Sequence, residues 1–317
     1  MTLGAPALGA PALPRTTPAA GGEGVRLVEI QYRSHAGHRR DAVVLVPQTY
    51  DRRRRPALAL VISPHGRGGT GRGNAMLWGD LPGRGQFAVV NPDGDGDHLA
   101  RFSWGAPGQI DDLARMPEIV ERALPWLRID RTRIYAFGAS MGGQETLLLV
   151  ERHPRLLAGA AAFDSVVDFA RQYDRFPQLA CDATCREGWH GDEGTVLQRL
   201  ARQELGGDPE RAPAAYAERS PLRHVRALAR AGVPLQIWWT PKDVIVRDPR
   251  TQSGRLLAEL RRLEPAAGVS AIEGDWAHTH EFRSTALLPK ALAAFGLLPR
   301  QLTASVPGLR IVREVSL

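Results

Sequence analysis

Ser140 has the spacing of an activated serine, because it stands between Gly138 and Gly142 in the stretch YAFGASMGGQE, residues 135–145. An apolar run precedes this stretch and helix-forming residues follow it. Glycines two positions to either side let a tight turn join a strand to a helix without side-chain collisions. Such a turn holds a hydroxyl away from the packed interior, where it can attack an electrophile. The plainer alternative is a glycine turn that only packs a helix close to a sheet.

A serine hydroxyl is a weak nucleophile, and it needs a base to take its proton and an acid to orient that base. Asp243 is the first candidate for the acid, because it follows the apolar stretch 233–240 and would lie at the carboxyl edge of a parallel sheet. Asp164, at the end of LLAGAAAFDS, is the rival acid. The alternative for Asp243 is a helix cap or a surface carboxylate.

Two histidines can supply the base, since both lie in VSAIEGDWAHTHEF, at the end of the last strand pattern. The loop expected between the strand end and the imidazole favours His278. His280 would lie further along, toward the next helix.

The stretch SPHGRGG, residues 63–69, can supply the donors that stabilise an oxyanion. It directly follows an apolar strand pattern, and its glycines let the backbone curl toward the serine turn. The expected donors are the backbone N–H groups of Met141 and Arg67. His65 is expected to hold this loop in place rather than to react.

The elements that must position these residues alternate between strand and helix patterns. Strand patterns cover 25–33, 41–47, 57–66, 87–94, 133–137, 156–165, 233–240 and 269–272, and helix patterns cover 110–127, 141–153, 252–263 and a stretch near 284–298. This alternation predicts an α/β fold with a mostly parallel central sheet flanked by helices. Pro117 is expected to bend or restart the helix 110–127.

The chain is expected to hold one such domain over residues 25–317. Residues 166–230 break the alternation and are expected to form a cap-like insertion at the rim of the sheet. Residues 1–24 repeat Gly-Ala-Pro-Ala-Leu and are expected to be disordered. They lack the basic start of a signal peptide, so a cytoplasmic location is the first expectation and secretion the alternative.

Composition excludes two classes of function. The formal net charge of the 317 residues is +7, but the arginines are scattered among acidic residues rather than gathered in a stripe, so no nucleic-acid partner is expected. No apolar run approaches the roughly 20 residues that cross a bilayer, so no membrane span is expected.

No metal and no cofactor are expected. Cys181 and Cys185 are the two cysteines, and zinc would need more support than His190 alone gives them. A disulfide between the two cysteines is geometrically awkward but open. The glycine-rich stretch GRGGTGRG lacks the Gly-Lys-Ser/Thr ending of a phosphate loop.

The chain resembles the α/β-hydrolase superfamily, and more narrowly its prolyl-oligopeptidase-like and esterase (polyhydroxybutyrate-depolymerase-like) branches. The resemblance rests on SPHGRGG, on the stretch from IDDLARMPEIV through RTRIYAFGASMGG, on VPLQIWWTPKDVIV and on GDWAHT, and spans roughly residues 25–298. It implies a serine hydrolase with a Ser140–Asp243–His278 triad and an acyl-enzyme intermediate.

The resemblance leaves the bond that is cleaved open between an ester and a short peptide. These residues show no β-propeller of the oligopeptidase kind, and WAHTH stands where a glycine-histidine is expected. The first departure argues against peptide cleavage and favours a small-molecule ester, and the second leaves the choice between His278 and His280 open. A hydrolase-shaped binding protein without turnover is the third alternative.

Overall fold

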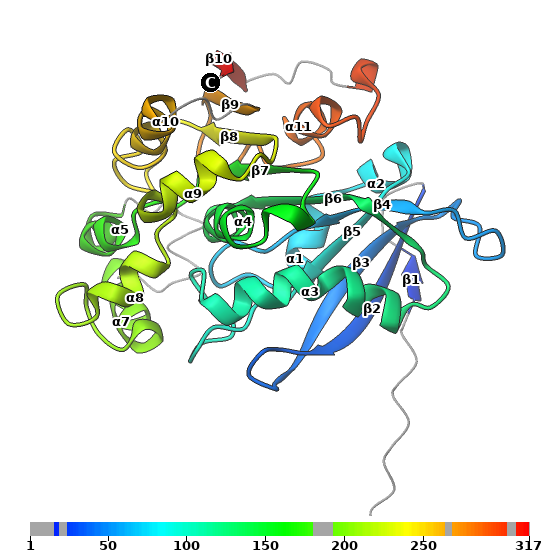
Figure 1. Cartoon of the computed structure of the whole chain (residues 1–317), viewed down its shortest axis with the longest axis horizontal. Coiled ribbons are helices and arrows are strands. Elements are labelled where there is room, and N and C mark those ends of the chain that lie inside the picture. Colours follow the sequence, from blue (N-terminus) through cyan, green and yellow to red (C-terminus); the bar gives the residue numbers. More distant parts are fainter. Residues whose placement is uncertain (1–15, 19–23, 180–192, 264–267, 303–308, 317) are drawn as a thin grey trace, which may run out of the picture.

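The protein is built around one twisted sheet, seen in a computed structural model that describes residues 16–18, 24–179, 193–263, 268–302 and 309–316 (Figure 1). In this part of the chain the sheet has ten strands in the order β1-β2-β3-β5-β4-β6-β7-β8-β9-β10. The strands are β1 (Thr16–Pro18), β2 (Val25–Arg33), β3 (Arg39–Pro47), β4 (Leu58–Ile62), β5 (Ala88–Pro92), β6 (Ile129–Ala139), β7 (Gly159–Phe163), β8 (Leu235–Trp239), β9 (Val269–Asp275) and β10 (Arg310–Ser316).

The central strands run parallel, as the alternation of strand and helix patterns predicts. The pairs β5/β4, β4/β6, β6/β7, β7/β8 and β8/β9 are parallel, and antiparallel strands extend the sheet at both ends. Each predicted strand is present; β2 has the predicted bounds, and the other predicted strands have shifted ends. The pattern at 133–137, for example, lies inside the longer strand β6.

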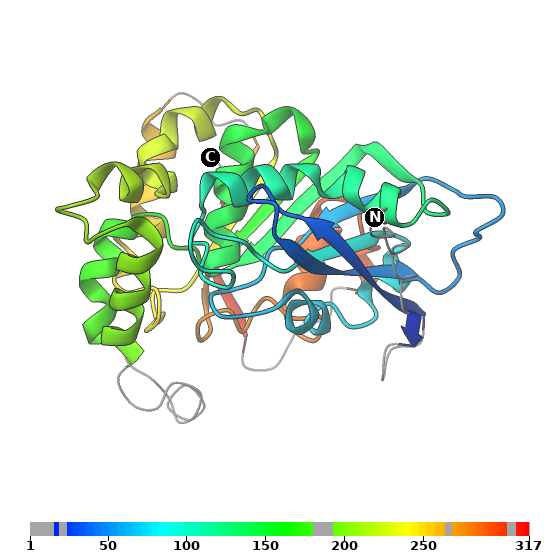
Figure 2. The same ribbon diagram turned by 90° about the horizontal axis from the view of Figure 1, so that it is seen from below.

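Helices cover both faces of the sheet, because its inner strands are apolar on both sides (Figures 1 and 2). Alternate residues serve the two faces, so that Val44 and Val46 belong to one cluster and Val43 and Leu45 to the other. The first face is covered by α3 (Pro107–Ala123), α4 (Met141–Arg152), α9 (Val225–Arg230) and α10 (Ser253–Arg262), and the second by α1 (Gly71–Met76), α2 (Leu81–Gly85) and α11 (Leu288–Ala294).

The insertion after β7 adds α5 (Phe169–Arg175), α7 (Glu193–Leu205) and α8 (Pro213–Glu218), grouped at one end of the sheet in both views (Figures 1 and 2). Short 3-10 turns lie at Pro154–Leu156, Phe176–Gln178, Pro221–His224 and Arg300–Leu302. The insertion helices share a third apolar cluster with the main body. That cluster includes Met141, directly after Ser140, and Val246, three residues after Asp243.

Some elements differ from the sequence-based expectation. Helix α3 begins at Pro107, where a proline suits the first turn because its missing N–H would be unpaired there, and it continues through Pro117. Helix α11 is shorter than the pattern near 284–298. Strand β10 was not expected, because its residues are mostly exposed and give no alternating apolar pattern.

The segment expected to be disordered, 1–24, contains the short strand β1, so the structure differs from that expectation at three residues. They pair antiparallel with the edge of β2, where backbone groups are open to another strand. Cys181, Cys185 and His190 lie outside the described residues. Among the helices that are described, none combines the length and the apolar character that crossing a bilayer requires.

Candidate active site

Four neighbouring parallel strands, β6, β7, β8 and β9, each lead into a polar residue at their carboxyl end. Ser140 directly follows β6 and Asp164 directly follows β7. Asp243 and His278 lie a few residues beyond the ends of β8 and β9. Because the strands are adjacent and parallel, all four residues lie at one edge of the sheet, where open α/β sheets place their sites.

The turn at Ser140 is strained. Its φ of 59° and ψ of −120° lie in a region that residues with side chains rarely adopt, and helix α4 begins at the next residue. The Ser140 N–H donates to the Phe163 carbonyl oxygen at 2.8 Å, which ties the turn to β7. A Cβ on Gly138 would lie 2.2 Å from the Gly142 carbonyl oxygen, so the strand and the helix can approach this closely only with glycine there.

Gly142→Ala tests this close packing. A Cβ at this position would lie 2.3 Å from the Pro64 carbonyl oxygen and 3.1 Å from that of His65, so it must push the loop after β4 away from Ser140. We expect a loss of about 1–3 kcal/mol in the free energy of unfolding, and about a 100-fold loss of kcat/KM, because the loop is displaced.

Gly254→Ala is the matched control. It also adds a Cβ in the first turn of a helix, but the nearest atom would be 3.7 Å away, an ordinary contact. Its free energy of unfolding should stay within about 0.5 kcal/mol of the parent in chemical denaturation. Equal stability and activity for the two variants would contradict the packing argument.

The structure pairs His278 with Asp243. The His278 Nδ1 and Asp243 Oδ2 atoms are 2.7 Å apart, and Asp243 is buried. The other Asp243 oxygen accepts the backbone N–H groups of Ile245 and Val246 at 2.8 and 2.9 Å, which fixes the carboxylate. This places the proton of a neutral imidazole on Nδ1 and leaves Nε2 as the basic nitrogen.

His280, the alternative base, is exposed. Its backbone N–H donates to the Ala277 carbonyl oxygen in the turn that carries His278. The structure thus brings only one of the two candidate imidazoles against the Asp243 carboxylate.

The pKa of His278 is raised above its ordinary value of 6.5. Burial disfavours the charged ring, but the Asp243 carboxylate, by its charge and its hydrogen bond, outweighs burial, and Asp164 adds to the same effect. The Arg67 guanidinium acts in the opposite direction. The imidazolium is therefore stabilised at the place where a general base would have to form it.

Asp164, the rival acid, is directed to other partners. One carboxylate oxygen accepts the Thr240 N–H at 3.1 Å and the other accepts the Thr279 N–H at 2.9 Å. Burial and the neighbouring Asp243 carboxylate raise the pKa of Asp164 to about 7. It lies near the His278 ring without making the hydrogen bond to it that Asp243 makes.

The loop after β4 lies against the serine turn. A Cβ on Gly66 would be 3.9 Å from the Cβ of Ser140. His65 is buried, its Nδ1 donates to the Gly66 carbonyl oxygen at 2.7 Å, and its Nε2 accepts the Gly94 N–H at 3.1 Å. Burial lowers the pKa of His65, so the ring is neutral and holds the loop, as the sequence predicts.

The side chain of Arg67 was not anticipated from the sequence, which suggested only its backbone N–H. Its guanidinium forms a buried ion pair with Glu193, at the start of α7 in the insertion, and it lies near Asp243 and His278. Glu281 was also missed. It is completely buried beside Asp164, and no local sequence signal distinguishes it from a surface glutamate.

Three potential metal-ligand side chains converge here, since ligand atoms of Asp164, Asp243 and His278 lie within 4.8 Å of one another. Their donor atoms already serve hydrogen bonds, because Asp243 holds His278 Nδ1 and both Asp164 oxygens accept backbone N–H groups. The donor set fits a hydrogen-bonded charge cluster better than a metal centre.

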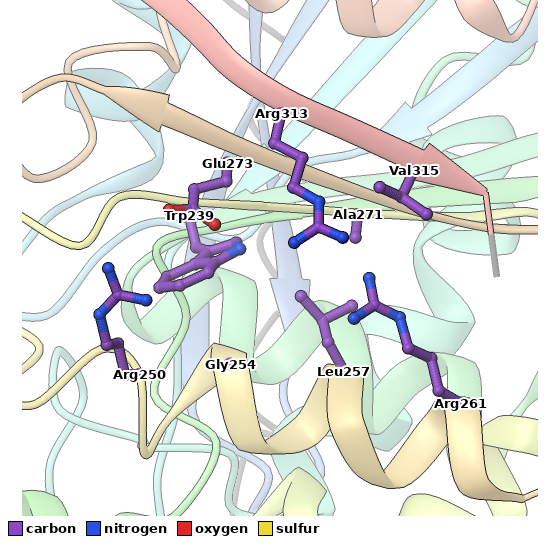
Figure 3. A pocket seen from close by; sticks show the side chains of 9 residues that line it. All are labelled: Trp239, Arg250, Gly254, Leu257, Arg261, Ala271, Glu273, Arg313 and Val315. Carbon is purple, nitrogen blue, oxygen red and sulfur yellow. The ribbon is translucent and has the colours of Figure 1, made fainter.

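A cavity of about 240 Å³ lies elsewhere, between α10 and strands β9 and β10 (Figure 3). The side chains of Arg250, Arg261 and Arg313 surround it, and Trp239 also lines it. Neither Ser140 nor His278 lines this cavity, so it is separate from the candidate active site.

Comparison with known proteins identifies the fold. No protein-family model matches the sequence, and no curated protein matches it. S-formylglutathione hydrolase from Agrobacterium tumefaciens superposes with a TM-score of 0.60 at 16% identity, covering 89% of this chain and 97% of that chain. The Staphylococcus aureus S-formylglutathione hydrolase gives a TM-score of 0.56 at 16% identity, with coverages of 86% and 99%.

A peptidase also superposes. Acylaminoacyl peptidase from Pyrococcus horikoshii gives a TM-score of 0.58 at 17% identity, covering 82% of this chain but only 38% of that chain. The chain therefore spans nearly the whole of the two hydrolases and well under half of the peptidase. It has the α/β-hydrolase fold, as its resemblance to that superfamily implies.

Proposed function

We propose that this protein is a serine hydrolase that cleaves carboxylic esters, with Ser140 as nucleophile, His278 as base and Asp243 as the acid that orients it. One observation carries the proposal: a serine held at positive φ lies at the same sheet edge as a buried aspartate–histidine pair. Backbone strain and buried ion pairs are costly, and they gather at reactive sites.

In the first half-reaction, the Ser140 hydroxyl gives its proton to His278 Nε2 as its oxygen bonds to the ester carbonyl carbon. The negative oxygen that forms would accept hydrogen bonds from the N–H groups of Met141 and Arg67. Collapse of this intermediate breaks the bond to the alcohol oxygen, and the imidazolium returns its proton to that oxygen. The products are a free alcohol and an acyl ester on Ser140.

In the second half-reaction, water takes the place of the serine. His278 removes a proton from the water as it attacks the acyl carbon, and then gives a proton back to the Ser140 oxygen as that bond breaks. A carboxylic acid leaves and the enzyme is restored. Asp243 keeps the imidazole in the tautomer that both steps require.

The insertion is proposed as a cap over this site. Its apolar cluster includes Met141 and Val246, next to the nucleophile and the acid in sequence. The ion pair between Glu193 and Arg67 connects α7 to the loop expected to bind the oxyanion. A cap held in place by these contacts would limit the size of the acyl or alcohol group of the ester substrate.

Cleavage of short peptides is the second candidate, and the superposition with a peptidase supports it. Measuring kcat/KM on p-nitrophenyl acyl esters and on aminoacyl p-nitroanilides distinguishes the two alternatives. The proposal expects clear preference for esters. A large preference for anilides would replace it with the peptidase, and no turnover of either would favour a hydrolase-shaped binding protein.

The pH dependence of hydrolysis should show the raised pKa of His278. The base must be neutral to accept the serine proton, so kcat/KM should fall as the pH drops through the pKa of His278. Because that pKa is raised, the midpoint should lie above the ordinary value of about 6.5. Initial rates of hydrolysis of one ester between pH 5 and 9, about two units on either side of neutrality, give this midpoint. A midpoint below the ordinary value contradicts the charge balance described above.

A further inference from the structure

Asp164 connects the two loops that carry the aspartate–histidine pair. Its Oδ1 accepts the N–H of Thr240, where the chain leaves β8 toward Asp243. Its Oδ2 accepts the N–H of Thr279, directly after His278. Asp164 itself has a positive φ of 40°, and its own N–H donates to the Trp238 carbonyl oxygen at 2.9 Å. A strained and buried residue at this junction fixes the separation of the two loops.

Glu281 supplies a further contact to this junction. Its side chain is completely buried, and its carboxyl group is in hydrogen-bonding contact with that of Asp164. Among the described residues, no N–H or hydroxyl group of another residue donates to either Glu281 oxygen, and only the N–H of Glu281 itself approaches its carboxyl group. Two ionised carboxylates cannot hydrogen-bond to each other, so the contact requires that one of them carries a proton.

The proton belongs on Glu281. Asp164 already accepts two backbone N–H groups in well-formed hydrogen bonds, which favour its ionised form, whereas among the described residues only its own backbone N–H approaches the Glu281 carboxyl group. Protonated Glu281 can then donate its O–H to Asp164, which gives Asp164 a third donor and gives the buried Glu281 O–H an acceptor. A fully buried glutamate without a proton would be an uncompensated charge.

We propose that Asp164 and Glu281 form a buried pair that shares one proton and positions His278, with Glu281 donating to an Asp164 carboxylate that holds the loops of His278 and Asp243. Neither residue is placed in contact with the substrate, so both are positioning residues. The kinetic consequence rests on the proposed function, but the protonation of the pair does not.

The charged groups around the pair agree with this assignment. Burial raises the pKa of Glu281 well above its ordinary value, and the carboxylates of Asp164 and Asp243 raise it further. His278 faces Asp164 from the loop after β9, and Arg67 faces His278 from the loop after β4. With Glu281 neutral, two carboxylates face the His278 ring and the Arg67 guanidinium.

Infrared difference spectroscopy tests the proton directly on the folded protein, without substrate. The spectrum of the parent minus that of Glu281→Gln should contain the carbonyl stretch of a protonated carboxylic acid, and that band should shift in D₂O. Glu145→Gln is the matched control, since Glu145 is another fully buried glutamate whose pKa burial raises, to about 7. Any band that Glu145 contributes persists in Glu281→Gln. If Glu281→Gln keeps every such band of the parent at neutral pH, the proposal is overturned.

Thermal unfolding gives a second readout that needs no activity. A proton held by folded Glu281 stabilises the fold fully below the unfolded pKa of about 4.3, and this contribution is lost as the pH rises toward the raised folded pKa. Glutamine has no such proton to lose. The Tm of Glu281→Gln relative to the parent should therefore increase with pH, and a difference that falls with pH would overturn the assignment.

Kinetics then separate positioning from simple packing. Glutamine copies the donor of a protonated glutamate, so Glu281→Gln should keep kcat/KM within about threefold of the parent near pH 7, whereas Glu281→Ala should lose about 100-fold through displacement of the His278 loop. At high pH the parent should decline as Glu281 ionises, while Glu281→Gln should not. Equal losses in both variants, or identical alkaline profiles for parent and Glu281→Gln, would overturn the positioning role. An inactive parent would instead refute the proposed function and leave the two earlier tests standing.

Discussion

Ser140→Ala is expected to lower kcat/KM for ester hydrolysis by about four to six orders of magnitude, the range found when the nucleophile of a serine triad is removed. The alanine leaves the fold and the His278–Asp243 pair in place but removes the oxygen atom that is proposed to form the acyl-enzyme. Steady-state hydrolysis of a p-nitrophenyl ester measures the loss, and the Tm shows that the variant is folded.

Ser270→Ala is the control for this prediction. Ser270 lies in β9, at intermediate exposure, and pairs in the sheet with residues of β8 and β10. Its kcat/KM should stay within about threefold of the parent. A folded Ser140→Ala protein that still hydrolyses the ester at a comparable rate would remove Ser140 from the mechanism.

His278→Ala is expected to cause a loss of similar size, about four to six orders of magnitude. Without the imidazole, the serine proton has no base to accept it, and the buried Asp243 carboxylate loses the His278 ring while keeping the Ile245 and Val246 N–H groups. His280→Ala is the matched control, since it removes a neighbouring but exposed imidazole and should stay within about threefold of the parent.

The two histidine variants together decide between the candidate bases. The measurement is kcat/KM for the same ester, with Tm values to confirm folding. A large loss in His280→Ala with little effect in His278→Ala would show that the exposed ring is the base, and that the pairing with Asp243 has another purpose.

Much of the fold could be predicted from local sequence. Apolar runs such as the one at 57–66 are recognisable because a parallel strand is buried on both faces, and the glycines around Ser140 mark a turn with little room. The edge strand β10 could not be predicted in this way, because its charged and mostly exposed residues carry no apolar alternation.

The candidate site was predicted less completely, because it depends on distances between separate strands. Ser140, Asp243 and His278 were suggested by their order and by the strands that precede them. The choice between Asp243 and Asp164 required the three-dimensional structure, in which His278 Nδ1 is hydrogen-bonded to Asp243. Glu281 had no local signal, since its importance lies in a contact with a residue 117 positions earlier in the chain.

The central claim is that Ser140 is an activated nucleophile, and reaction with a fluorophosphonate tests it most directly. The serine oxygen should displace fluoride and bond to phosphorus, and peptide mapping by mass spectrometry should place one label on Ser140 of the folded parent. The label should be absent from Ser140→Ala and form far more slowly in His278→Ala. A folded parent that takes no label, or that is labelled equally well without Ser140, would contradict the account.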